Sequence, residues 1–190
     1  MKTNKFELDN IIAITELNSE LEVEQASSLI AKFKWMQKED ETLKSLRKHL
    51  VSLIEKYEDE HWSDVDEITD EQVEKSDRAE WFVEQHNLFT QRRKEIIRAS
   101  LKERNLKQKD LAHILGRSVS YLSEQLNGVR QFSNNDIKIL RRSFKIPLKE
   151  LFDLYMEEDV RNRVKEVIKE YPDANLELNK EDLVYAENVI

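Results

Sequence analysis

The chain has 190 residues, of which 37% are charged and 39% hydrophobic, and its formal net charge is -8. This length allows one or two modest domains with a small core. The lack of cysteine excludes disulfides and thiol chemistry, and the apolar run 11–14 is too short for a signal peptide or a membrane span, so we expect a cytoplasmic protein without membrane contact. Because glycine and proline are rare and Leu, Glu, Lys, Arg and Gln abundant, the sequence predicts an all-α fold.

The net charge is distributed unevenly along the chain. Residues 91–145 contain 14 Lys and Arg against 5 Asp and Glu, a local net charge of +9. Residues 1–90 carry a net charge of -11, and residues 146–190 carry -6. A basic segment between acidic flanks is typical of a nucleic-acid-binding module joined to parts that contact something else.

Residues 1–60 predict a helical hairpin that serves partner binding or dimerisation. Residues 1–17 give only a weak, mixed pattern, after which residues 18–20 offer a helix N-cap. Two apolar stripes follow at helical spacing: Ala26, Leu29, Ile30, Phe33 and Met36, and then Leu43, Leu46, Leu50, Leu53 and Tyr57. Residues 38–42 contain no apolar side chain and predict the bend. One continuous helix is the alternative, but two antiparallel helices would bury both stripes.

Residues 61–88 predict an acidic linker. The stretch 58–74, EDEHWSDVDEITDEQVE, is strongly acidic, and its Trp62, Val65 and Ile68 are too few to form a core. Such a composition is typical of a linker or of a segment that becomes ordered on binding.

Residues 89–155 predict a domain of five helices, and residues 156–190 predict a helical tail. The domain's helices are expected over 90–104, 108–115, 118–126 and 133–144, with a fifth beginning at Pro147 and carrying Leu148, Leu151 and Phe152. The tail carries an apolar face up to Pro172, formed by Val160, Val164, Val167, Ile168 and Tyr171. A short segment over about 180–189 is expected to follow it.

The stretch 108–127, QKDLAHILGRSVSYLSEQLN, predicts a helix-turn-helix. Leu111 and Leu115 face the core, and Gly116 lies where the turn requires a positive φ, which is unfavourable for other residues. Ser118 is expected to cap the second helix of the motif, the one that would enter the DNA major groove. The residues left on the outward side of that helix are Val119, Ser120, Tyr121 and Glu124.

Basic and polar residues around this motif predict contacts to the DNA backbone. Gln108 begins the first helix of the motif and is placed for a phosphate. Arg130, in the loop after Gly128, is expected to clamp the backbone, with Lys109 and Arg117 nearby. Two positions depart from the usual pattern, because Arg117 and Gln125 stand where apolar residues are common.

The sequence offers no pattern typical of an enzyme or of a cofactor site. The four histidines are scattered without repeated ligand spacing, so no metal site is expected. Neither a glycine-rich phosphate loop nor a nucleophile elbow is present. We therefore expect a binding protein without a cofactor.

The segment 108–152 resembles the lambda-repressor-like (XRE) helix-turn-helix family. Its LSEQLNGVR, followed by IKILRRSFKIP, is most similar to the HigA-type antitoxins, and LVSLIEKYEDEHW, over 50–62, is similar to the helix that precedes their DNA-binding domain. The resemblance covers about 43–152. It implies a five-helix lambda-repressor-like domain, here preceded by the α-helical hairpin and followed by the helical tail.

The resemblance also implies a function. It implies a homodimer that binds a palindromic operator in double-stranded DNA, represses its own operon and neutralises a HigB-type toxin, a basic RelE-like ribonuclease that cleaves messenger RNA. The DNA contacts that it carries over to this chain are Gln108, Ser118, Val119, Ser120, Tyr121 and Arg130. Glu124 is less suited to reading a base, because a carboxylate accepts only from cytosine and repels phosphate.

The acidic N-terminal region fits this partner, because a region of net charge -11 would be attracted to a basic, RNA-binding toxin. The alternative is that the acidic faces only keep a helical bundle soluble. Two other functions remain open at this stage. One is a transcriptional regulator without a toxin partner, whose flanking helices serve dimerisation only, and the other is an interaction scaffold that has lost DNA binding.

Overall fold

The computed structural model describes residues 5–36, 41–153, 156 and 158–178. Every regular element among these residues is a helix, which confirms the predicted all-α fold. The chain divides into two units, Met1–Phe152 and Asp153–Ile190. No helix of the described part is long and apolar enough to cross a membrane. The segment expected over 180–189 lies outside the described residues.

The N-terminal helices are α1, Glu20–Trp35, and α2, Glu41–His61, and they pack against each other. The Ser19 hydroxyl caps α1 by accepting a hydrogen bond from the Glu22 backbone N–H at 3.3 Å. Every apolar residue of the stripe predicted for the second helix is buried, because its spacing of three and four places them on one face. The two-helix interpretation is therefore confirmed; the residues between the helices, 37–40, are not among those described.

Residues 5–17, whose sequence pattern is weak, complete the core of this hairpin. They include a short 3₁₀ helix, η1, Ile11–Ala13, and bury four apolar side chains against α1 and α2. These side chains are Phe6, Ile11, Ile14 and Leu17. The Glu20 carboxylate, at the start of α1, accepts hydrogen bonds from the Tyr57 hydroxyl and the Trp62 indole, both at 3.0 Å, and so joins the two helices.

The prediction of a linker over 61–88 is wrong for most of that range. After a short 3₁₀ helix, η2, Val65–Glu67, the helix α3 begins at Asp70 and runs without interruption to Glu103. Thr69 caps it, and the acidic residues of its first turn interact favourably with the helix dipole. The Gln72 side chain also donates to the last carbonyl of α2, at His61, at 2.7 Å, which fixes the turn between the two helices.

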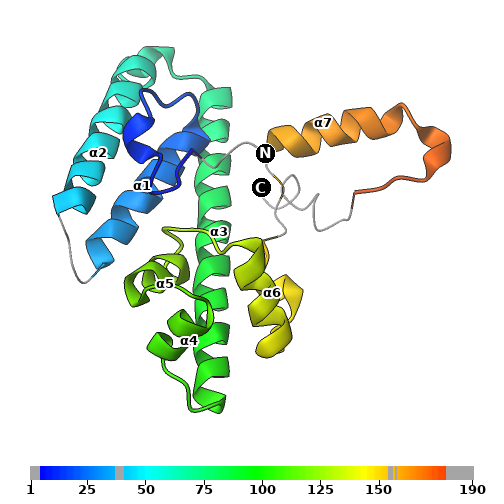
Figure 1. The fold of residues 1–190 in the computed structure, drawn as a ribbon. Helices are drawn as coiled ribbons and strands as arrows, with labels where there is room; N and C mark the ends of the chain where they lie inside the picture. Colours follow the sequence, from blue (N-terminus) through cyan, green and yellow to red (C-terminus); the bar gives the residue numbers. More distant parts are fainter. Residues whose placement is uncertain (1–4, 37–40, 154–155, 157, 179–190) are drawn as a thin grey trace. The chain divides into compact units, whose positions relative to one another are not determined.

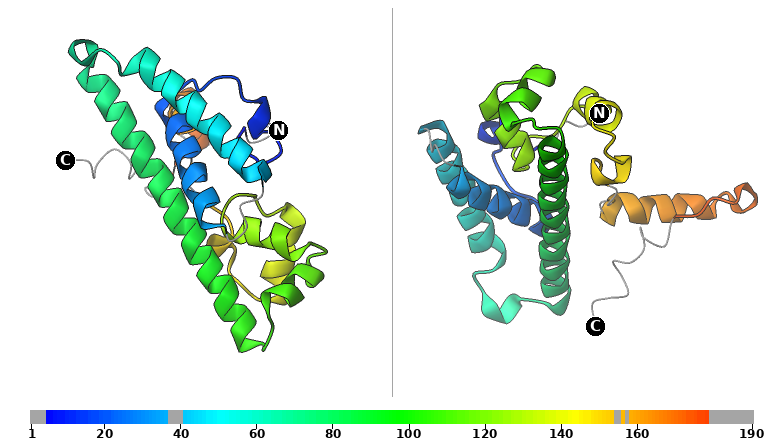
Figure 2. Two further views of the ribbon diagram at one scale, coloured as in Figure 1. Left: turned by 90° about the vertical axis from the view of Figure 1, so that its left-hand side faces the viewer. Right: turned by 90° about the horizontal axis from the view of Figure 1, so that it is seen from below.

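The 34 residues of α3 connect two separate cores (Figures 1 and 2). Its N-terminal half packs along α1, where the Ser28 hydroxyl donates to Asn87 at 3.1 Å. Its C-terminal half contributes Ile97 and Leu101 to the second core. Figure 2 shows α3 as one long continuous helix, with the hairpin and the remaining helices of this unit placed at different levels along it.

The second core is formed by the end of α3 together with α4, Gln108–Ile114, α5, Val119–Leu126, and α6, Asn134–Ser143. Ser133 caps α6 as predicted. The fifth predicted helix is only a 3₁₀ turn, η3, Leu148–Glu150. Of the three apolar residues expected on it, only Leu151 is buried, and the turn is held to α3 by an ion pair between Arg92 and Glu150 at 2.9 Å.

The unit after Phe152 contains α7, Glu158–Lys169, and a 3₁₀ turn, η4, Pro172–Ala174. Proline ends α7, because it cannot donate a backbone hydrogen bond to a further turn and disfavours helical backbone in the residue before it. The predicted helical tail is thus helical in its described N-terminal part.

Candidate nucleic-acid interface

The turn between α4 and α5 depends on one glycine. Gly116 has a φ of +67°, as the sequence predicted. Its backbone N–H donates to the His113 carbonyl at 3.0 Å, and the Arg117 N–H donates to the Ala112 carbonyl at 2.8 Å. This pair of hydrogen bonds satisfies the last carbonyls of α4 and reverses the chain direction within two residues. The turn therefore sets the angle at which α5 leaves α4.

The first turn of α5 is the most exposed part of the motif. Ser118 caps the helix, and its hydroxyl accepts from the Tyr121 N–H at 3.1 Å. Val119 is 50% exposed and Ser120 is also exposed, whereas Leu122 and Leu126 are buried on the opposite side. Of the four residues predicted on the outward side, Val119 and Ser120 are thus exposed, whereas Tyr121 is half-buried and the Glu124 side chain is only 15% exposed. The two exposed side chains are small and leave room for approach to a base edge.

The two departures from the usual motif, Arg117 and Gln125, are explained by a buried carboxylate. Gln125 is fully buried, and its amide donates to the Gln131 carbonyl at 3.1 Å and to Asp136 at 3.0 Å. Arg117 forms an ion pair with the same carboxylate at 3.4 Å. Burial raises the pKa of Asp136, but the hydrogen bonds from Gln125 and Ser133 and the charge of Arg117 outweigh it, so the pKa lies below its ordinary value.

Three of the predicted DNA-contacting residues form one stack. The Tyr121 ring lies between two guanidinium groups, with Arg117 at 5.0 Å and Arg130 at 4.9 Å from the ring centroid. Both distances are typical of cation–π contacts, which hold the ring in one orientation. The structure thus brings together residues from the turn, from α5 and from the loop that follows α5.

Arg130, which was predicted to contact the DNA backbone, is already paired with two carboxylates. Its Nε donates to Glu124 on α5, and its two terminal nitrogens donate to Asp9 at 2.7 and 3.0 Å. The hydrogen bonds to Asp9 and Glu124 outweigh partial burial and raise the pKa of Arg130, and the bond from Arg130 lowers the pKa of Asp9. The Arg130 side chain is only 14% exposed.

The loop after α5 is also attached to the N-terminal core. Gly128 has a φ of +71°, and the next residue, Val129, is buried among the apolar side chains of α1 and α2. Asn127, the last residue before this glycine, accepts a hydrogen bond from Lys94 of α3 at 2.6 Å. The loop that leaves α5 is therefore held both by the N-terminal core and by α3.

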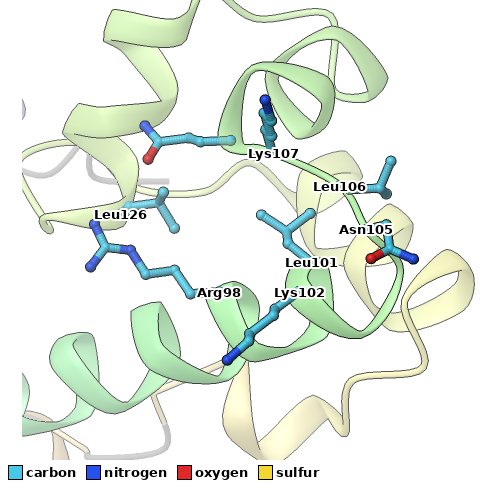
Figure 3. Close-up of a pocket in the computed structure, with 8 residues that line it drawn as sticks. Arg98, Leu101, Lys102, Asn105, Leu106, Lys107 and Leu126 are labelled. Carbon is cyan, nitrogen blue, oxygen red and sulfur yellow. The ribbon is translucent and has the colours of Figure 1, made fainter.

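Gln108 and Lys109 lie in the first turn of α4. Lys109 is exposed, and Gln108 lines a pocket that is rich in basic side chains (Figure 3). Figure 3 shows the Arg98 side chain extending beneath Leu126, while the Lys102 ammonium points away from Leu101. The pocket is lined by Arg98, Leu101, Lys102, Asn105, Leu106, Lys107, Gln108 and Leu126. Basic groups at this place are available to a phosphate that reaches Gln108.

The sequence did not indicate that Asp9, Glu124 and Lys94 would contact this surface. Asp9 is separated from Arg130 by 121 residues, so no local pattern relates the two. Glu124 was recognisable only as a poor base reader, and the structure shows it paired with Arg130 instead. Lys94 lies in the helix predicted over 90–104, but no local pattern relates it to Asn127, which is 33 residues away.

The comparison with known proteins points to the same region. Residues 97–151 match the sequence model of a family described as helix-turn-helix. The match begins in α3 and extends to Leu151, so it includes α4, the turn at Gly116 and α5. It supports a DNA-binding transcriptional regulator and agrees with an all-α, lambda-repressor-like fold. No curated protein and no solved structure matched the chain.

Proposed function

We propose that this protein is a sequence-specific DNA-binding repressor that reads its operator with the first turn of α5. The observation that carries the proposal is the exposed start of α5, residues 118–120, within a helix-turn-helix and on a segment of net charge +9. Exposed residues at the start of α5 would read base edges, and the surrounding basic residues would contact phosphates. We propose also that the protein binds as a homodimer and that its operator is palindromic.

An electrophoretic shift with the DNA upstream of the protein's own gene tests this function. We expect a discrete complex at moderate salt that survives an excess of unrelated duplex, because specific contacts add to the phosphate contacts. Light scattering of the complex then gives the number of chains per duplex. If no complex forms at low or moderate salt, the interaction scaffold without DNA binding becomes the better interpretation.

Two substitutions separate the proposed roles of the interface residues. Arg130→Ala should weaken binding to all duplexes and reduce the slope of log affinity against log salt by about 1, because one phosphate contact is lost. Ser120→Ala should reduce the preference for the operator over a scrambled duplex and leave the salt slope unchanged. Equal losses on both duplexes for both variants would show that the reading face lies elsewhere.

We propose further that the protein is an antitoxin of the HigA type. This proposal is supported by the resemblance of 50–62, 122–130 and 137–147 to such proteins and by the net charge of -11 over residues 1–90. The acidic region would attract a basic ribonuclease and compete with RNA for its surface. The alternative is a regulator of a phage or a stress response whose flanking helices serve dimerisation only.

The open reading frames next to the gene decide between these two regulators. For an antitoxin, we expect a neighbouring frame that encodes a small basic protein, whose expression arrests growth and whose effect is reversed by this chain. Copurification of the two proteins should weaken as salt rises, because the attraction is electrostatic. A neighbouring product that neither arrests growth nor binds this chain would leave the regulator without a toxin.

A further inference from the structure

Asp9, in the N-terminal segment, forms an ion pair with Arg130, the residue proposed to contact a DNA phosphate. All three guanidinium nitrogens of Arg130 donate to carboxylates: one to Glu124 and two to Asp9. The Asp9 contact is bidentate, with each carboxylate oxygen accepting from a different terminal nitrogen. In this state the terminal nitrogens of Arg130 are already engaged.

A phosphate group would use the same nitrogens. Carboxylate and phosphate both offer two oxygens that match the planar fork of a guanidinium, and both prefer this bidentate arrangement. Asp9 occupies the pair of N–H groups that forms this fork, so a DNA phosphate can make the bidentate contact with the two terminal nitrogens of Arg130 only by displacing Asp9.

The two carboxylates on Arg130 differ in how readily they can be displaced. The Asp9 side chain is 77% exposed, whereas that of Glu124 is 15% exposed. Release of an exposed carboxylate costs little, because water hydrates its oxygens in place of the arginine. A partly buried pair is lost at a greater cost, because it leaves a charge behind without solvent. Asp9 is thus the exchangeable partner, and Glu124 keeps Arg130 oriented over Tyr121.

Asp9 remains near Arg130 because its neighbours in the chain are anchored. Phe6 and Ile11, on either side of it, are buried in the N-terminal core. The Glu7 carboxylate accepts a hydrogen bond from the Gln131 backbone N–H, beside Arg130. A tethered group acts at a high effective concentration, so Asp9 competes with phosphate at every protein concentration.

We infer that Asp9 is an internal competitor for DNA phosphate and lowers the affinity of the protein for DNA. This inference rests on the proposed DNA-binding function. The competition acts on a phosphate contact, so it lowers affinity for specific and unrelated duplexes alike. It weakens unspecific binding without altering the residues that read bases.

The test measures binding of the full chain to a fluorescein-labelled duplex of arbitrary sequence by anisotropy at low salt. Asp9→Asn should bind about two- to fivefold more tightly than the unmodified chain, which is the range expected for release from one exposed ion pair. Asp9→Ala, which removes both acceptors, should gain at least as much. The matched control is Glu16→Gln, which changes the net charge equally at an exposed position of the same N-terminal segment.

The same comparison in an Arg130→Ala background identifies the cause of any gain. Without the guanidinium, Asp9→Asn should have no larger effect than Glu16→Gln, because the competition has no target. A gain that persists in this background would overturn the inference and indicate general repulsion of DNA. So would an Asp9→Asn variant that binds like Glu16→Gln or more weakly than the unmodified chain.

The two levels of the proposal fail in different ways. If the unmodified chain does not bind the duplex at any salt concentration, the DNA-binding function itself is wrong. If it binds, and Asp9→Asn gives no gain over Glu16→Gln, only the competition is wrong. Thermal unfolding of each variant, followed by circular dichroism, confirms that the compared chains are equally folded.

Discussion

Gly116 and Gly128 both adopt left-handed backbone conformations, but their surroundings differ. A Cβ atom at Gly116 would meet no other atom within 4 Å. A Cβ atom at Gly128 would lie 2.8 Å from the Thr90 Cγ2 atom on α3. The first glycine is therefore required by its φ alone, and the second by its φ and by close contact with another helix.

This difference predicts unequal costs for two alanine substitutions. Gly116→Ala should lower the free energy of unfolding by about 1–2 kcal/mol, the cost of a left-handed conformation with a Cβ. Gly128→Ala should lower it by roughly 1–3 kcal/mol more, because α3 and the loop must also move apart. Urea unfolding of the two variants checks this, and equal losses would contradict the close contact at Thr90.

The sequence predicted the local features of the site but not its contacts between distant residues. The positive φ at Gly116 and the cap at Ser118 followed from local rules, and both are present. The polar partner of buried Gln125 did not, because Asp136 lies on another helix and reaches it only after folding. The contact between Asp9 and Arg130 could not be predicted from local sequence either, because it depends on how the N-terminal segment packs against the loop after α5.

Among the elements, α3 shows why an acidic stretch was mistaken for a linker. Its sequence contains few apolar residues, so it lacks the hydrophobic periodicity by which an amphipathic helix is recognised. Helix-stabilising ion pairs at a spacing of four were present, however, between Glu71 and Lys75 and between Glu74 and Arg78. With the cap at Thr69, these pairs are the pattern from which the helix could have been predicted.

Another element-scale feature is a lysine on the inner side of α1. The Lys32 ammonium lies beside Gly128, and burial, together with the charge of Arg93, lowers its pKa from 10.5 to about 8. The folded protein therefore binds fewer protons than the unfolded chain between these two pH values. The charged form destabilises the fold below pH 8, and this cost is relieved as the pH rises toward 10.5.

We therefore predict that the free energy of unfolding rises between pH 8 and pH 9.5. The slope should approach about 1.4 kcal/mol per pH unit at most. Lys32→Met should reduce the rise and stabilise the protein at neutral pH, leaving the contribution of Lys94, whose pKa burial also lowers. Lys34→Met, at an exposed position of the same helix, should leave the rise intact. Urea unfolding at several pH values measures this, and identical pH profiles for the unmodified chain and Lys32→Met would contradict the prediction.

At the scale of the whole molecule, the two cores of Met1–Phe152 are connected at two places. The helix α3 contributes to the second core with its C-terminal half and packs along α1 with its N-terminal half. Val129 leaves the helix-turn-helix and joins the core of α1 and α2. The composition and charge predicted separate modules, but they could not show that a single side chain from one module completes the core of the other.

These connections predict that a destabilising substitution in the hairpin also destabilises α5. Phe33→Ala removes a fully buried side chain from the N-terminal core and should cost roughly 3–5 kcal/mol. Hydrogen exchange of the amides of residues 122–126 should then accelerate along with those of α1 and α2. Val65→Ala, at a 77% exposed position, is the control. Faster exchange confined to α1 and α2 would show that the two cores unfold independently.

The burial of Val129 in the N-terminal core has a thermodynamic consequence for any partner of the hairpin. The residue directly follows the glycine that ends α5, so a change in packing around it is a change in the loop that carries Arg130. Where a partner binds the hairpin and alters this packing, linkage requires that DNA changes the partner's affinity by the same factor by which the partner changes the affinity for DNA. A partner bound to the hairpin would then change the affinity of the helix-turn-helix for DNA, and bound DNA would change the affinity of the hairpin for the partner.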